Sequence, residues 1–265
     1  MKLESIALHH GYKSDPTTKA AAVPIYQTTS FTFDDTQHGA DLFDLKVAGN
    51  IYSRIMNPTN DVLEQRMAQM EGGVGALCVA SGMSAITYAI QAIAQNGDNI
   101  VSTSQLYGGS YNLFAHTFPR QGIDVRMVKA DNYAGFEAAI DDRTRAIFCE
   151  SIGNPAGNIV DIARLAKIAH SKGVPLIVDN TVATPYLCRP FELGADIVVH
   201  SLTKYINGHG TAIGGMIVDS GKFDWKANAT RFAMMNEPDP SYHNVVYTDA
   251  FAEAAFIGRC RVVPL

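Results

Sequence analysis

The chain has 265 residues, of which 47% are hydrophobic and 18% charged, enough to form the core of one sizeable α/β domain. Its net charge of −5 excludes the basic surface with which proteins bind nucleic acids or anionic membranes. The longest apolar runs have only the length of strands, so we expect no membrane span and a cytoplasmic protein. Four widely spaced cysteines are expected to be reduced thiols without a metal: Cys78, Cys149, Cys188 and Cys260.

The first 59 residues are predicted to form an irregular N-terminal arm. Pro16, Pro24 and Pro58 interrupt any helical pattern in this segment. An ordered arm without regular structure needs a surface to lie on, so we expect residues 1–59 to contact a neighbouring subunit. From residue 60 the pattern becomes helical, and Asn60 is the predicted N-cap residue.

Short apolar runs alternate with helical segments after Gly72. The runs are continuously apolar, which is typical of strands buried on both faces of a sheet. This alternation predicts a three-layer α/β/α domain with a mostly parallel sheet over residues 60–250, with ligands at the carboxyl ends of its strands. The predicted strands are Ala76–Ala80, Ile100–Thr103, Val125–Val128, Ala146–Cys149, Leu176–Val178 and Ile197–Val199, with a further strand or hairpin over Thr211–Val218; the predicted helices include Met83–Ala94 and Ile162–Ala169.

Lys204 follows the last of the six predicted strands and is a candidate reactive residue. Burial of an ammonium group without a partner is costly, so a lysine at this place suits an ion pair, a phosphate contact or covalent chemistry as a desolvated amine. The hydroxyls of Ser201 and Thr203 suit phosphate oxygens. The same residues fit the S-x-x-K motif of serine β-lactamases, but the chain lacks S-D-N and K-T-G, and the segment leaves a strand rather than opening a helix.

Two other strand ends carry polar groups. Asp179 ends an apolar run, where a carboxylate can bond a protonated ring nitrogen and keep that ring an electron sink; alternatively, it caps the next turn. The segment Ser81-Gly82-Met83 turns a strand into a helix. The free N–H groups of such a turn form an anion site, although many turns of this kind are only structural.

An aromatic residue and an arginine complete the set of candidates. Tyr107 precedes two glycines after a strand. It either stacks on a planar cofactor or is an ordinary tyrosine at the rim of the domain, without a role in binding. In the arm, Arg54 suits bidentate phosphate recognition and Tyr52 adds a phenol donor; both would complete a neighbour's site, unless Arg54 is simply solvated. A phosphate cradle, a carboxylate for a ring nitrogen, a stacking aromatic and a reactive amine together indicate pyridoxal 5′-phosphate (PLP).

With these motifs in this order, the sequence resembles the Cys/Met-metabolism family of PLP-dependent enzymes of fold type I. The resemblance rests on Tyr52-Ser53-Arg54-x-x-Asn57-Pro58-Thr59, on Ser81-Gly82-Met83 and on Ser201-x-Thr203-Lys204-Tyr205. It implies the aminotransferase-like large domain of that family. Within the family, the stretches Glu150–Pro155 and Gly208–Gly215 are similar to the O-acetylhomoserine sulfhydrylase branch, as are residues 45–50.

The resemblance also implies roles for the matching residues. Lys204 would be joined covalently to the cofactor and would move protons, with Tyr107 assisting. Asp179 would pair with the ring nitrogen, and Asn154 would lie near the phenolic oxygen of the cofactor. No metal is expected. The predicted cofactor-binding residues are Tyr52, Arg54, Ser81, Gly82, Met83, Tyr107, Asn154, Asp179, Thr181, Ser201, Thr203 and Lys204.

The reaction that the resemblance implies is γ-replacement in methionine biosynthesis. Sulfide or methanethiol would replace the acetate of O-acetyl-L-homoserine, giving homocysteine or methionine. Cystathionine γ-synthase and methionine γ-lyase are alternatives, as is a truncated, non-catalytic PLP-binding homologue. Family members continue into a smaller C-terminal domain whose arginine binds the substrate α-carboxylate, so residues 251–265 are expected to begin a truncated C-terminal segment. We expect a homo-oligomer, a dimer with shared active sites that forms a tetramer.

Overall fold

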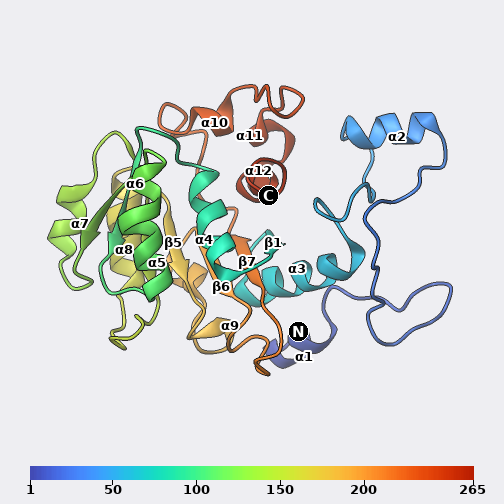
Figure 1. Ribbon diagram of the computed structural model, residues 1–265, viewed down its shortest axis with the longest axis horizontal. Coiled ribbons are helices and arrows are strands. Elements are labelled where there is room, and N and C mark those ends of the chain that lie inside the picture. The colour runs from blue at the N-terminus through green and yellow to red at the C-terminus, as the bar shows by residue number, and fades with distance from the viewer.

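A seven-stranded sheet forms the centre of the computed structural model, which describes residues 1–265 (Figure 1). Its strands are β1 (Gly75–Val79), β2 (Asn99–Thr103), β3 (Asp124–Val128), β4 (Thr144–Glu150), β5 (Leu176–Asp179), β6 (Ile197–Ser201) and β7 (Gly215–Asp219). The order across the sheet is β1-β7-β6-β5-β4-β2-β3. Only β7 is antiparallel to its neighbours, β1 and β6. The predicted α/β fold with a mostly parallel sheet is therefore confirmed.

Helices cover both faces of this sheet, and none of them combines the length and the hydropathy needed to cross a bilayer. A π-helical turn, η1, joins α5 to α6, and two short 3₁₀ helices, η2 and η3, lie in the C-terminal half of the chain. The helical elements are α1 (Leu3–His9), α2 (Thr36–Phe43), α3 (Pro58–Glu71), α4 (Gly82–Gln91), α5 (Gly108–Asn112), η1 (Leu113–Thr117), α6 (Phe118–Arg120), α7 (Tyr133–Ala139), α8 (Ile162–Ser171), α9 (Thr184–Leu187), η2 (Pro190–Leu193), α10 (Ala233–Asn236), α11 (Tyr247–Ala250), η3 (Ala252–Ala254) and α12 (Ala255–Val262).

Successive side chains of each strand enter two different hydrophobic cores. On β4, Ala146 and Phe148 pack in the core that α4 and α12 cover, whereas Ile147 and Cys149 pack in the core that α3, α7 and α8 cover. All four side chains are fully buried. Since both faces of the sheet are covered, both sets of side chains must be apolar, and this explains the continuous apolar runs in the sequence. The helix α12 belongs to the first core through Phe256, which is also fully buried.

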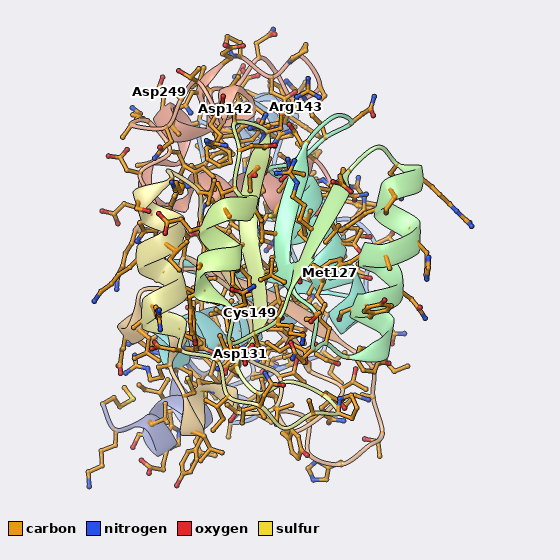
Figure 2. All side chains as sticks on the ribbon, turned by 90° about the vertical axis from the view of Figure 1, so that its left-hand side faces the viewer. Met127, Asp131, Asp142, Arg143, Cys149 and Asp249 are labelled. Carbon is orange, nitrogen blue, oxygen red and sulfur yellow. The ribbon has the colours of Figure 1, made fainter.

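The direction of the strands is visible in Figure 2. Asp142 and Arg143, which precede β4, lie near the upper end of the sheet, whereas Cys149, close to the end of β4, lies lower. Asp131, which follows β3, also lies low. The carboxyl ends of these parallel strands therefore point downward, toward one edge of the sheet.

The arm contains more regular structure than the sequence indicated. It forms α1 and α2, and the side chain of Asp35 caps α2 by accepting the N–H of His38 at 2.7 Å. Figure 1 shows α2 and its flanking segments projecting from the rest of the molecule. The N-cap of α3 is Asn57 rather than the predicted Asn60. Pro58 begins this helix instead of breaking it, because a first-turn proline loses no intrahelical hydrogen bond.

The C-terminal part of the sheet also differs from expectation. The segment Thr211–Val218 was expected to be one strand or a hairpin, but β7 begins only at Gly215. Residues 211–213 are exposed and lack regular structure. They belong to the connection between the end of β6 and the start of β7, which lie at the same edge of the sheet.

The packing of Phe148 on β4 leads to a testable prediction about stability. Phe148 is fully buried and meets the ring of Phe114 edge to face, with ring centres 5.0 Å apart. Replacement Phe148→Ala leaves a cavity and should lower the free energy of unfolding by about 3–5 kcal/mol. Urea denaturation measures this change. The control Leu8→Ala removes a side chain that is 70% exposed and should change stability by no more than about 0.5 kcal/mol; equal losses for both variants would contradict the described core.

Candidate functional site

One edge of the sheet carries most of the predicted site residues. Every strand except β7 runs in the same direction, so the segments that follow these strands meet at the edge that points downward in Figure 2. The turn after β1 carries residues 81–83, and the segment after β2 carries Tyr107. Asn154 follows β4, Asp179 ends β5, and residues 201–204 end and follow β6.

Two glycines bring the turn after β1 into contact with the end of β6. Ser201 on β6 and Gly215 on β7 are register partners. A Cβ atom on Gly215 would overlap the carbonyl oxygen of Ser81, and one on Gly82 would lie 2.6 Å from the Cβ atom of Ser201. Glycine is therefore required at both positions for this close approach. As a result, α4 begins directly against Ser201.

The start of α4 offers hydrogen-bond donors at this contact. Ser81 caps the helix, since its Oγ atom accepts the N–H of Ser84 at 3.1 Å. The N–H groups of Gly82 and Met83 belong to the first turn and have no partner inside the helix. Together with the positive end of the helix dipole and the nearby hydroxyl of Ser201, these N–H groups suit a phosphate group. We call Ser81, Gly82, Met83 and Ser201 the phosphate cradle.

Asp179 lies beside this cradle and forms no ion pair. Its Oδ1 atom accepts the N–H of Thr181 at 2.9 Å, and Thr181 Oγ1 accepts the N–H of Ser201 at 2.8 Å. Burial raises the pKa of the Asp179 carboxyl group above its usual value. Because a cationic donor would stabilise the ionised form of such a group, this carboxylate fits a protonated pyridine nitrogen.

Lys204 lies just beyond β6, with an exposed side chain. Its N–H donates to the carbonyl oxygen of Ser201 at 3.3 Å. The hydroxyl of Thr203 is bonded to Gly214, at 3.1 Å from its nitrogen and 3.2 Å from its oxygen. The desolvation that the sequence suggested for Lys204 is thus absent from this chain alone. Any such desolvation must come from a bound ligand or from another subunit.

Glu150, the last residue of β4, connects the two segments that carry Tyr107 and Asn154. Its Oε1 atom accepts the N–H of Tyr107 at 2.6 Å, and its Oε2 atom accepts the N–H of Asn154 at 3.0 Å. The side chain is buried, which raises the pKa of its carboxyl group to about 7. Glu150 is not among the predicted site residues, although it ends a continuous apolar strand as Asp179 does. That shared position is the signal that could have identified it.

A buried polar network lies next to the cradle. His200 Nε2 lies 2.6 Å from Glu71 Oε1, and Asn180 Nδ2 donates to the same oxygen at 3.2 Å. All three side chains are fully buried. The network ties the end of α3 to the neighbours of Asp179 and Ser201. No local pattern in the sequence pairs Glu71 with His200, because 129 positions separate them.

Tyr52 and Arg54 lie apart from the other candidates. Both are exposed, and the guanidinium of Arg54 lies 5.7 Å from the ring centre of Tyr52. An isolated bridge pairs Tyr52 with Ser30, inside the arm. No hydrogen bond joins either residue to the cradle. One chain therefore brings together the predicted residues of the sheet edge, but not those of the arm.

The residues of this edge fit PLP better than a metal ion. The free N–H groups of α4 can hold a phosphate, and Asp179 can face a ring nitrogen. Lys204 offers an accessible amine, and Tyr107, which is 46% exposed, offers an aromatic face. No three His, Cys, Asp or Glu side chains are grouped as a metal site requires.

Residues 4–245 match the sequence profile of a family described as Cys/Met metabolism PLP-dependent enzyme. A homocysteine synthase of Schizosaccharomyces pombe is 53% identical over 263 residues, which cover 99% of this chain and 61% of that protein. An O-acetyl-L-homoserine sulfhydrylase of Leptospira meyeri is 51% identical over 269 residues, covering 98% of this chain and 60% of that protein. The chain thus spans about three fifths of the length of these relatives.

A solved structure is similar over almost the whole chain. It is that of a Campylobacter jejuni protein described as an O-acetylhomoserine (thiol)-lyase, which contains N′-pyridoxyl-lysine-5′-monophosphate. The TM-score is 0.93 at 42% identity, and the match covers 97% of this chain and 62% of the other. The fold of this chain is therefore that of a PLP-dependent enzyme.

The glycine contact should control cofactor affinity. The variant Gly82→Ala places a methyl group against Ser201 and should shift the first turn of α4 away from the phosphate position. Loss of one charge-assisted hydrogen bond, worth about 1.5–3 kcal/mol, would make PLP binding roughly 10- to 150-fold weaker. Titration of the cofactor-free protein with PLP measures the change. The control is Gly108→Ala, since a Cβ atom on Gly108 meets nothing within 4 Å. Unchanged affinity in the Gly82 variant would contradict the cradle.

The buried network should contribute to stability. Removing one partner of a buried hydrogen bond costs about 1–3 kcal/mol, because the polar atom of the other partner is left unsatisfied. We expect Glu71→Ala to lower the free energy of unfolding by this amount. Since both residues share one interaction, the double variant Glu71→Ala/His200→Ala should lose less than the sum of the single losses. Additive losses in urea denaturation would show that the two residues act independently.

Proposed function

Since this chain belongs to the Cys/Met-metabolism family of PLP-dependent enzymes, we propose that it forms the cofactor-binding part of an O-acetyl-L-homoserine sulfhydrylase. The enzyme would exchange the acetate of O-acetyl-L-homoserine for sulfide or methanethiol, with homocysteine or methionine as product, in methionine biosynthesis. The observation that carries this proposal is the close contact of the Ser81–Gly82 turn with Ser201, beside the carboxyl group of Asp179, which forms no ion pair. The names of the relatives in Schizosaccharomyces pombe and Leptospira meyeri support the choice of substrate.

The residues of the cradle would bind and orient the cofactor. The N–H groups of Gly82 and Met83 and the hydroxyl of Ser201 would donate to its phosphate, with Thr203 free to join once its bond to Gly214 opens. Asp179 would accept a hydrogen bond from the ring nitrogen and keep that nitrogen protonated. When bound in this way, PLP supplies an electron sink for negative charge that develops on the substrate carbons.

Three further side chains would act around the ring. Tyr107 would cover one face of it, and Asn154 would donate to its phenolic oxygen. Lys204 Nζ would hold the cofactor covalently between turnovers. During turnover it would take a proton from the substrate Cα atom and then one from Cβ as acetate leaves Cγ. After the thiolate adds at Cγ, it would return a proton to Cβ and to Cα. Since Lys204 is tethered beside these carbons, its proton transfers are effectively intramolecular.

We also propose that a second copy of the chain completes each site. The exposed pair Tyr52 and Arg54 would donate to the phosphate of a neighbouring subunit, and the same neighbour would cover Lys204. This is supported by the exposure of both side chains and by the absence of any hydrogen bond between them and the cradle of their own chain; Arg54 donates instead to the carbonyl oxygen of Leu265 at 3.4 Å. We further propose a tetramer of two such dimers. A cytoplasmic location would agree with four cysteines that form no disulfide.

Replacing the amine tests the role of Lys204. The full-length protein reconstituted with PLP should absorb visible light, and Lys204→Ala should abolish the lysine-linked absorption band. Acetate release from O-acetyl-L-homoserine should fall by at least about a hundredfold, because a positioned proton-transfer group is lost. The control Lys222→Ala removes a lysine outside the site and should keep both properties. A wild-type protein that stays colourless with PLP would overturn the proposed function.

A steady-state comparison of donors tests the choice of substrate. We expect sulfide or methanethiol, but not cysteine, to accelerate acetate release from O-acetyl-L-homoserine by the full-length protein. Faster release with cysteine would identify a cystathionine γ-synthase instead. Cleavage of methionine without an acyl-homoserine would identify a methionine γ-lyase. A protein that binds PLP and turns over none of these substrates would be a non-catalytic homologue.

A further inference from the structure

Glu150 occupies a position that the proposed reaction does not explain. Its side chain forms hydrogen bonds with two candidates, Tyr107 and Asn154, in both cases with the backbone N–H. These two residues lie on segments that follow adjacent parallel strands, β2 and β4. One buried carboxylate thus bonds to both segments, with one oxygen for each.

We propose that Glu150 is a positioning residue, whose two oxygens fix the backbone at Tyr107 and at Asn154 and thereby set the relative places of the two side chains that face the cofactor. The inference rests on the proposed function only where it assigns Tyr107 and Asn154 to the cofactor. The hydrogen bonds themselves belong to the protein without its cofactor.

Packing alone does not hold these segments. Asn154, Pro155 and Ala156 are exposed, and so is Tyr107. Their backbone positions therefore depend on hydrogen bonds, and a charged acceptor makes stronger ones than a neutral acceptor. A carboxylate can hold both N–H groups because each of its two oxygens accepts a hydrogen bond. The amide of a glutamine would have one such oxygen, and its NH₂ group would face an N–H donor.

The negative charge of Glu150 and its two hydrogen bonds predict opposite changes in PLP binding, so one variant distinguishes the two roles. Glu150 and Asp179 are register partners on β4 and β5, so their negative charges oppose each other. Removing the charge of Glu150 would favour the ionised form of Asp179 and strengthen its bond to a cationic ring nitrogen. A purely electrostatic role therefore predicts tighter cofactor binding in Glu150→Gln. The positioning role predicts weaker binding.

Asp219 provides a matched control at the opposite edge of the sheet. It ends the antiparallel strand β7, and its two oxygens accept the N–H groups of Gly221 at 2.9 Å and of Ile257 at 3.2 Å. Like Glu150, it is buried, with a pKa raised to about 7 by that burial. The variant Asp219→Asn thus removes the same kind of double acceptor far from the cradle.

The experiment compares Glu150→Gln and Asp219→Asn with the wild type in the full-length protein. In the cofactor-free state, we expect Glu150→Gln to speed amide hydrogen exchange at Tyr107 or Asn154 by about tenfold or more, as for a lost charge-assisted bond. With PLP, we expect the visible band to persist, the PLP dissociation constant to rise by about tenfold, and kcat to fall more than KM changes. Asp219→Asn should lose stability to a similar degree but keep the wild-type PLP affinity and kcat.

Each other result contradicts the inference. Wild-type exchange rates at both amides, or tighter PLP binding, would show that Glu150 does not hold these segments in place. Equal losses of PLP affinity in both variants would show that only general stability is affected. If the wild type fails to bind PLP, the proposed function fails by itself, and the exchange rates of the cofactor-free protein still decide whether Glu150 holds the two segments.

Discussion

The contact between the Ser81–Gly82 turn and the β6–β7 pair is the constraint on which the rest of this structure depends. Residues 82 and 215 leave no room for a side chain, so the first turn of α4 lies directly on the end of β6. The fully buried Ala85 and Ala89 then hold α4 on the sheet. Because of this contact, the free N–H groups of the helix face the same space as Asp179 and the residues after β6. A larger separation would leave an ordinary helix start and an isolated carboxylate.

Much of this arrangement follows from local patterns in the sequence. Continuous apolar runs predicted the strands because each strand side chain must enter one of two cores, as Phe148 and Cys149 do. The parallel order then predicted that polar residues at strand ends would meet at one edge. Asp179, Ser201 and the Ser81–Gly82 turn do meet there. The structure leaves their roles toward a cofactor as predictions.

The remaining features depend on contacts between distant residues. The pairing of Glu71 with His200 and of Glu150 with the backbone of Tyr107 is set by the folded sheet, and sequence spacing carries no signal for either. The start of α3 was misplaced because Pro58 indicates a break in most contexts, yet it favours a first helical turn when a capping residue such as Asn57 precedes it. The arm is a different case, since its proposed contacts lie outside a single chain.

The antiparallel direction of β7 has a consequence for the movement of Lys204. The segment from Leu202 to Gly214 leaves and re-enters the sheet at one edge, where Ser201 and Gly215 are paired. The backbone of Lys204 is held on both sides, because its N–H donates to the carbonyl oxygen of Ser201 at 3.3 Å and its carbonyl oxygen accepts the N–H of Gly208 at 2.9 Å. The backbone at Lys204 is therefore anchored, while the flexible four-carbon stem above it rotates. In the proposed reaction, the amine would therefore move from one substrate carbon to the next by rotation of its side chain alone, while the backbone beneath it stays in place.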